Sequence, residues 1–148
     1  MAKREAIAAA LYLLLNVEAG KVENIKTSSR KLRHFDSVKS AEMPALFQAQ
    51  NPETYQRTVA DGPPKRTMHF SIWIYTADAQ QPEVIPSQQI NNIVDAIEAA
   101  LAPSPLTGMF TLGGLVHRCW IEGTIEIYEG VTSDGKSIAI IPIAVLMP

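Results

Sequence analysis

The stretch KRTMHFSIWIYT, residues 65–76, alternates in character along its whole length. One side of the alternation holds Met68, Phe70, Ile72 and Ile74. A period of two with aromatic and β-branched residues predicts a β-strand of about 10–12 residues, which is longer than usual. The preceding Asp61-Gly62-Pro63-Pro64 is a strong chain break.

One helix is expected before this strand in the sequence and one after it. In residues 4–20, REAIAAALYLLLNVEAG, the spacing of Ile7, Leu11 and Leu14 fits a helix on a core, and Gly20 stands where a C-terminal glycine cap belongs. The same stretch loosely resembles a secretory signal, but Glu5 at the edge of the apolar run and the single cysteine favour a structural helix. Its ten apolar residues are fewer than the roughly 20 that span a bilayer.

The second helix is expected after residue 87, with Ser87 as its cap. Its apolar face is formed by Ile90, Ile93, Val94, Ile97 and Leu101. Pro103 and Pro105 end it.

Further strands are expected at residues 22–27 and 44–50, with a turn at Asn51-Pro52. The C-terminal third predicts a long hairpin of residues 116–128 and 137–148, turning at Asp134-Gly135. Pro142 removes a backbone donor, which predicts an edge strand or a break there. The predicted fold is one α+β domain over residues 1–148, a mostly antiparallel sheet with two helices packed on it and a long C-terminal β-hairpin.

Composition narrows the class of protein. The 148 residues are 47% hydrophobic and 19% charged, which is typical of a globular chain. A net charge of −2 does not favour a general nucleic-acid binder. The single cysteine, Cys119, excludes an internal disulfide and is compatible with a reducing compartment.

A search for enzymatic motifs fails. The sequence has no Gly-rich phosphate loop, no paired-cysteine zinc spacing and no nucleophile elbow. His117 and Cys119 are expected on one strand face and suggest a thiol–imidazole pair, but their isoleucine neighbours favour a buried thiol. We therefore expect no catalytic, cofactor-binding or metal-binding residue and no enzyme.

Residues 26–40, KTSSRKLRHFDSVKS, are rich in positive charge and lack an apolar period, which predicts a mobile loop. The loop is either solvated or docks on an acidic protein surface or on phosphates. The candidate docking residues are Lys26, Arg30, Lys31, Arg33, His34 and Lys39.

The first helix has more large apolar residues than one contact face needs. Either its own domain buries it on two sides, or part of it contacts another subunit. The last strand raises the same question, because an exposed apolar edge needs a cover. The candidate subunit-interface residues are Tyr12, Leu13, Leu15 and Pro142.

The order of segments resembles a known family. An arginine-bearing N-terminal helix is followed by IKTSSR (25–30), MPALFQAQ (43–50), GPPKRTMHFSIWIYT (62–76), QQINNIVDAIEAAL (88–101), TLGGLVHRCWIEGTIEIYEG (111–130) and IAIIPIAVLMP (138–148). Nearly the whole chain thereby resembles the tail terminator (tail completion) proteins of long-tailed bacteriophages, the minor tail protein U type.

The resemblance implies a non-enzymatic virion protein of the phage tail that is assembled in the host bacterial cytoplasm, without a membrane. Such a protein forms a closed ring, a hexamer, that caps the tail tube, ends its polymerisation and offers a surface for head–tail joining. Its implied partners are itself, the tail tube protein and a head connector or neck protein, with DNA passing through without specific binding. The alternatives are another head–tail connector or tube-like component and, less favoured, a small cysteine–histidine enzyme.

Overall fold

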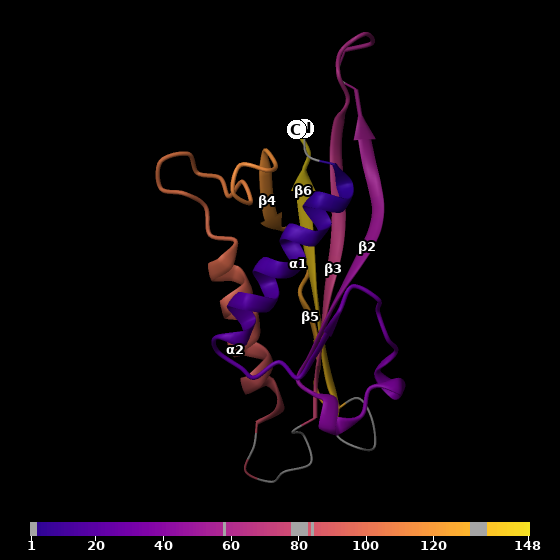
Figure 1. Ribbon diagram of the computed structural model, residues 1–148, viewed down its shortest axis with the longest axis vertical. Helices are drawn as coiled ribbons and strands as arrows, with labels where there is room; N and C mark the ends of the chain where they lie inside the picture. The colour runs from indigo at the N-terminus through magenta and orange to yellow at the C-terminus, as the bar shows by residue number, and fades with distance from the viewer. Residues whose placement is uncertain (1–2, 58, 78–82, 84, 131–135) are drawn as a thin grey trace.

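The computed structural model describes residues 3–57, 59–77, 83, 85–130 and 136–148. Two helices lie on one face of a six-stranded sheet, which confirms the predicted α+β class (Figure 1). The elements are α1 (Arg4–Gly20), β1 (Thr27–Ser29), the short 3-10 helices η1 (Phe35–Ser37) and η2 (Ser40–Glu42), β2 (Ala45–Gln56), β3 (Lys65–Thr76), α2 (Pro86–Ala100), β4 (Arg118–Ile121), β5 (Glu126–Tyr128) and β6 (Ser137–Leu146).

The sheet has the order β1-β2-β3-β6-β4, with β5 also paired to β6. The β1–β2 pair is parallel and the other pairs are antiparallel. The strand β3 occupies the predicted residues 65–76 and lies in the middle of the sheet. Its predicted apolar face is buried beneath the helices. The alternation of residues 65–76 thus correctly locates the centre of the fold.

The helix α1 confirms the structural interpretation of the N-terminal stretch. Its buried residues are Ile7, Ala8, Leu11, Leu15 and Ala19. The apolar stripe is therefore rotated from the predicted one, and Leu14 is only half-buried on its flank. Gly20 is the last helical residue, and Lys21 caps the helix in a right-handed conformation, so the expected glycine cap is wrong.

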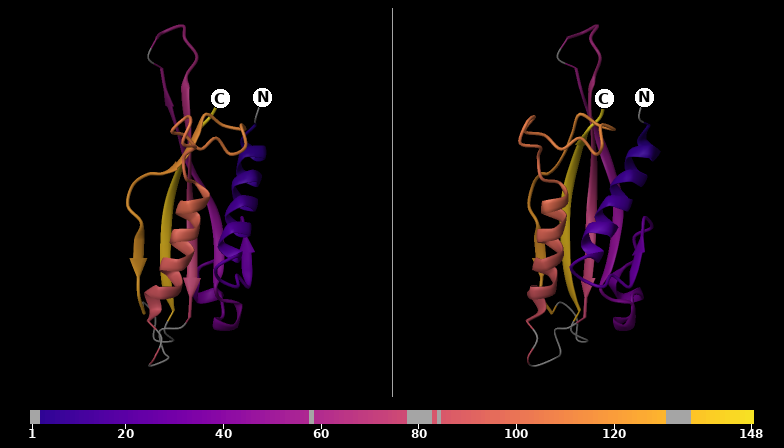
Figure 2. Two further views of the ribbon diagram at one scale, coloured as in Figure 1. Left: turned by 90° about the vertical axis from the view of Figure 1, so that its left-hand side faces the viewer. Right: turned by 60° about the vertical axis from the view of Figure 1, so that its left-hand side comes forward.

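The helix α2 packs on the same sheet face as α1 (Figures 1 and 2). Its predicted face is confirmed, with Ile90, Ile93 and Ile97 fully buried. It begins two residues earlier than expected, because Pro86 takes the first helical position and Ile85 is the N-cap, so Ser87 is no cap.

Two of the predicted strands have other bounds in the structure. The first strand is β1, Thr27–Ser29, rather than residues 22–27. The strand β2 continues through Asn51-Pro52, where the pairing with β3 shifts register instead of turning. A bulge absorbs the proline because an irregular position needs no ladder donor. The predicted turn at Asp134-Gly135 lies outside the described residues.

The predicted strand 116–128 is two strands, β4 and β5, separated at Gly123. This break explains Pro142, which lies inside the sheet in an unbroken β6, contrary to prediction. The carbonyl of Pro142 accepts from the amide of Glu122, so its nitrogen also faces the β4–β5 side. The proline nitrogen, which has no N–H to donate, therefore faces the interval between β4 and β5, where β6 has no regular strand partner.

Candidate functional site

The segment 26–40 is anchored to the body rather than structureless. It contains β1 and η1, and Val38 is fully buried against the sheet. The hydroxyl of Tyr75 donates to the carbonyl of Arg33 at 2.6 Å, and Lys136 Nζ donates to the carbonyl of Phe35 at 3.0 Å. The expectation of a loop without secondary structure is therefore wrong at β1 and η1, while the mobility of the segment stays a prediction.

Two arginines of this segment are engaged within the chain. Arg30 makes a bidentate ion pair with Glu5 of α1, at 2.6 and 3.0 Å. The hydrogen bond and charge of Arg30 lower the pKa of the Glu5 carboxyl. Arg33 is 3.3 Å from Glu42 and donates to the carbonyl of Ser37 at 2.6 Å. The charges of these two arginines are therefore largely compensated by the fold.

The lysines of the segment are placed differently. Lys26, Lys31 and Lys39 are exposed, and no ion pair is recorded for them within the described part of the chain. Lys26 immediately precedes β1, and Lys31 follows it by two residues. His34 is also exposed, with its ring 4.3 Å from that of Phe35. Arg30 is exposed as well, so of the six candidate docking residues only Arg33 is half-buried.

The candidate interface residues separate into three kinds. Leu13 is 66% exposed on the outer side of α1. Tyr12 is half-buried, and its hydroxyl donates to Ser28 of β1 at 2.9 Å. Leu15 is fully buried in the core, so proposing it as an interface residue is wrong. Pro142 is half-buried on the sheet face that carries no helix.

That second sheet face holds a feature that the sequence reasoning missed. A smaller apolar cluster gathers there around Phe47, Tyr75 and Ile138. Beside it lies a groove of about 380 Å³, lined by Leu32, Arg33, His34, Phe35, Trp73, Tyr75, Tyr128, Ile138 and Ile140. The signal was present in residues 137–146, because a continuous apolar run predicts a strand that is buried on both faces.

A hairpin arm formed by the ends of β2 and β3 extends beyond the body (Figure 1). Tyr55 and Val59 on this arm are 57% and 65% exposed. Arg4 ties its base to α1, because the guanidinium bonds Glu53 and the hydroxyl of Tyr55 at 2.8 Å. The arm is a second exposed feature with apolar side chains.

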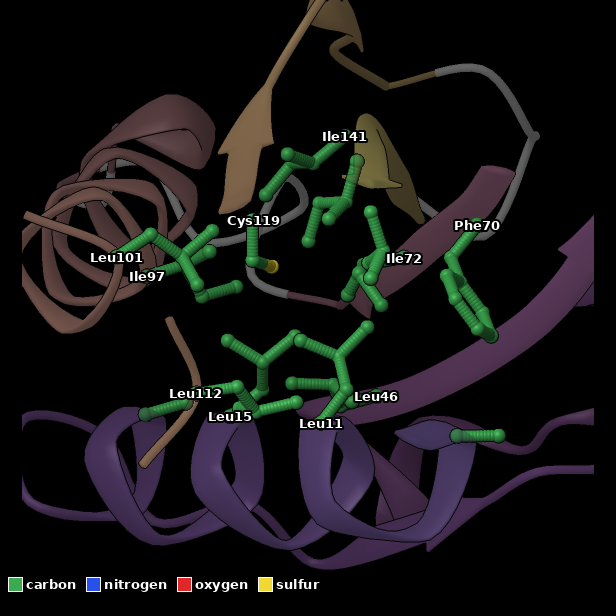
Figure 3. Close-up of a cluster of buried hydrophobic side chains, with 14 of the residues drawn as sticks. Leu11, Leu15, Leu46, Phe70, Ile72, Ile97, Leu101, Leu112, Cys119 and Ile141 are labelled. Atoms are coloured by element: carbon green, nitrogen blue, oxygen red, sulfur yellow. The ribbon is translucent and has the colours of Figure 1, made fainter. Parts of the chain in front are cut away.

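Cys119 does not form the suggested thiol–imidazole pair. It lies in the main core among Leu101, Leu112 and Ile141 (Figure 3), whereas His117 is exposed. Burial raises the pKa of the Cys119 thiol to about 12. A neutral thiol inside an apolar core is a poor nucleophile.

Within the described ranges, no group of three or more His, Cys, Asp or Glu side chains forms a potential metal site. Among the helices described, none is long and apolar enough to cross a membrane.

Comparisons with known proteins show a shared fold. A solved chain from the "Virion of native gene transfer agent (GTA) particle" covers 96% of this chain and 95% of its own, with a TM-score of 0.51 and 12% identity. A second solved structure, whose name describes no function, covers 99% and 96%, with a TM-score of 0.56 and 14% identity. No family model matches the chain, and no curated protein matches it.

Proposed function

We propose that this chain is a structural protein of a bacteriophage or phage-like particle. The observation that carries the proposal is the fold shared over nearly the whole length of both chains with a component of a gene transfer agent virion. The order of sequence segments, which resembles tail terminator proteins, supports the same class independently of the fold comparison.

Within that class, we propose a tail terminator that closes the tail tube as a ring, a hexamer by the family resemblance. A closed ring needs two different, complementary patches on each subunit. The chain offers several exposed features that are suited to contact, namely Leu13 on α1, the hairpin arm, the groove beside Trp73 and the exposed lysines of segment 26–40. The lysines fit an acidic protein surface of the assembly, and DNA passes through the ring without a specific site.

The two alternatives differ from a terminator in different respects. Another head–tail connector or a tube component uses the same exposed surfaces, so only its position in the particle distinguishes it. The cysteine–histidine enzyme is disfavoured, because Cys119 is 1% exposed and its thiol is held neutral.

The test is deletion of the gene in the genome that encodes it, followed by electron microscopy of the particles. A terminator predicts overlong tubes without heads. Loss of all tubes indicates a tube component, and tails of normal length without heads indicate a connector. Gold-labelled protein added to assembled tubes should bind at one end of a tube, and labelling along the whole length would contradict the proposal.

A further inference from the structure

Charge is distributed unevenly along the chain. Residues 1–66 contain 11 Lys and Arg against 7 Asp and Glu, whereas residues 67–148 contain 2 against 8. The sheet order separates the two charges in space. One edge of the sheet is formed by β1 and β2 from the first part of the chain, and the other side is formed by β6, β4 and β5 from the second part. The N-terminal elements and β5 stand at opposite sides of the molecule (Figure 2, left).

The acidic side lacks internal compensation. Glu122, Glu126 and Glu129 are exposed along the β4–β5 edge, and Asp95 and Glu98 are exposed on the neighbouring α2. Every ion pair found within the described residues lies in the first 53 positions, so none involves these five carboxylates. Arg118 on β4 is the one lysine or arginine of residues 118–129 and stacks over the Trp120 ring at 4.6 Å, so the edge remains net negative.

The β1 edge, on the opposite side of the sheet, presents positive charge. Lys26 and Lys31 flank β1, whose free side is the other edge of the sheet. Both side chains are exposed, and no acid of the chain pairs with them in the described structure. Arg30 and Arg33 are compensated by Glu5 and Glu42, so the lysines supply the available charge.

The β4–β5 edge also leaves backbone and apolar groups uncovered. Among the described strands, β5 pairs only with β6, and Ile127 and Tyr128 are 40% and 46% exposed. An exposed strand edge with apolar side chains is a site for pairing with another chain. The acidic and apolar character together fit a partner with an open strand flanked by lysines.

We infer that the β4–β5 edge of one copy of this chain contacts the β1 edge of the next copy. Two acidic edges or two basic edges repel, so a two-fold dimer through either edge is disfavoured. Only the head-to-tail arrangement joins opposite charges, and such an arrangement generates a ring when its rotation closes. The inference rests on the proposed ring and names the two surfaces that meet in it.

The test reverses each edge separately. Glu126→Lys with Glu129→Lys makes both edges basic, and Lys26→Glu with Lys31→Glu makes both edges acidic. Each double variant alone should self-associate about tenfold or more weakly than the wild type, because like charges then face each other. An equimolar mixture should restore association, since each reversed edge then meets its complement, and it should form only alternating assemblies with an even number of subunits.

Sedimentation velocity with native mass spectrometry measures both results, and thermal unfolding checks that each variant folds. The controls Glu83→Lys and Lys3→Glu change the net charge in the same two directions at exposed positions that belong to neither edge nor to the hairpin arm, and they should leave association unchanged. Wild-type association should also weaken between about 0.01 and 0.15 M salt, as the Debye length falls from about 30 to about 8 Å.

The outcomes separate the two proposals. A wild type that associates while both edge variants associate equally well overturns this inference and leaves the ring intact. Folded variants that are not rescued by mixing also overturn it. A wild type that stays monomeric at low salt and on tail tubes contradicts the ring itself.

Discussion

Three consecutive leucines of α1 provide a graded test of the packing. Leu15 is fully buried, Leu14 is half-buried and Leu13 is 66% exposed. Replacing leucine by alanine removes three carbons, worth about 2.4 kcal/mol of transfer free energy at about 0.8 kcal/mol per methylene. A cavity adds to this cost where the surroundings do not collapse.

We therefore expect Leu15→Ala to lower the free energy of unfolding by about 3–5 kcal/mol and Leu14→Ala by about 1–2 kcal/mol. Leu13→Ala should change it by less than about 0.5 kcal/mol. Urea denaturation followed by far-UV circular dichroism measures the three values. For a chain of this size, the Leu15→Ala change corresponds to a melting temperature lowered by about 6–20 °C.

The reasoning is refuted if Leu13→Ala destabilises the monomer as much as Leu15→Ala. Such a result would mean that α1 presents a different face to the sheet. Leu13→Ala also serves the ring proposal, since a variant with unchanged stability and weaker self-association would identify Leu13 as an interface residue.

Two further changes have defined outcomes. Cys119 in the native protein should react with iodoacetamide at pH 8 far more slowly than in the unfolded protein. Its pKa of about 12 exceeds that of an unfolded thiol, about 8.5, so its contribution to stability is complete below about pH 8.5 and is lost as pH rises toward 12. Alkaline melting curves should therefore show a weaker pH dependence for Cys119→Ala than for the wild type. Gly123→Ala should cost about 1–3 kcal/mol in urea denaturation, because φ is +109° and the new Cβ lies 3.4 Å from Pro142 Cγ, whereas the helical control Gly20→Ala, with open space around it, should be neutral or stabilising.

The elements with long, regular periods were predictable. Alternation fixed β3 to the residue, and helical spacing fixed the buried face of α2. Both patterns repeat over many residues, so one atypical residue or contact does not change the predicted element. Predictions that depended on one residue fared worse, since pairing with β3 carries β2 past Pro52 and the β4–β5 interval accommodates Pro142.

The sequence predicted which charged residues the candidate site contains, but not which of them are free of internal ion pairs. The sequence shows the cations of segment 26–40, but the acid that compensates Arg30 is 25 residues away on α1. Nothing local distinguishes Arg30 from Lys31, because the distinction arises only when α1 and β1 lie side by side. The groove beside Trp73 was missed for the same reason, since it forms where three strands and segment 26–40 meet.

This difference between charge content and available charge decides which residues report on docking. A substitution Arg30→Glu places a carboxylate against Glu5, and Arg33→Glu does the same against Glu42. Both changes alter internal contacts of the subunit as well as any surface contact, so lost function in either variant does not distinguish folding from docking. Lys26 and Lys31 are exposed, so their reversal leaves the internal ion pairs in place. The lysines beside β1, rather than the arginines that first attract attention in the sequence, are therefore the residues through which contact with an acidic partner is measured.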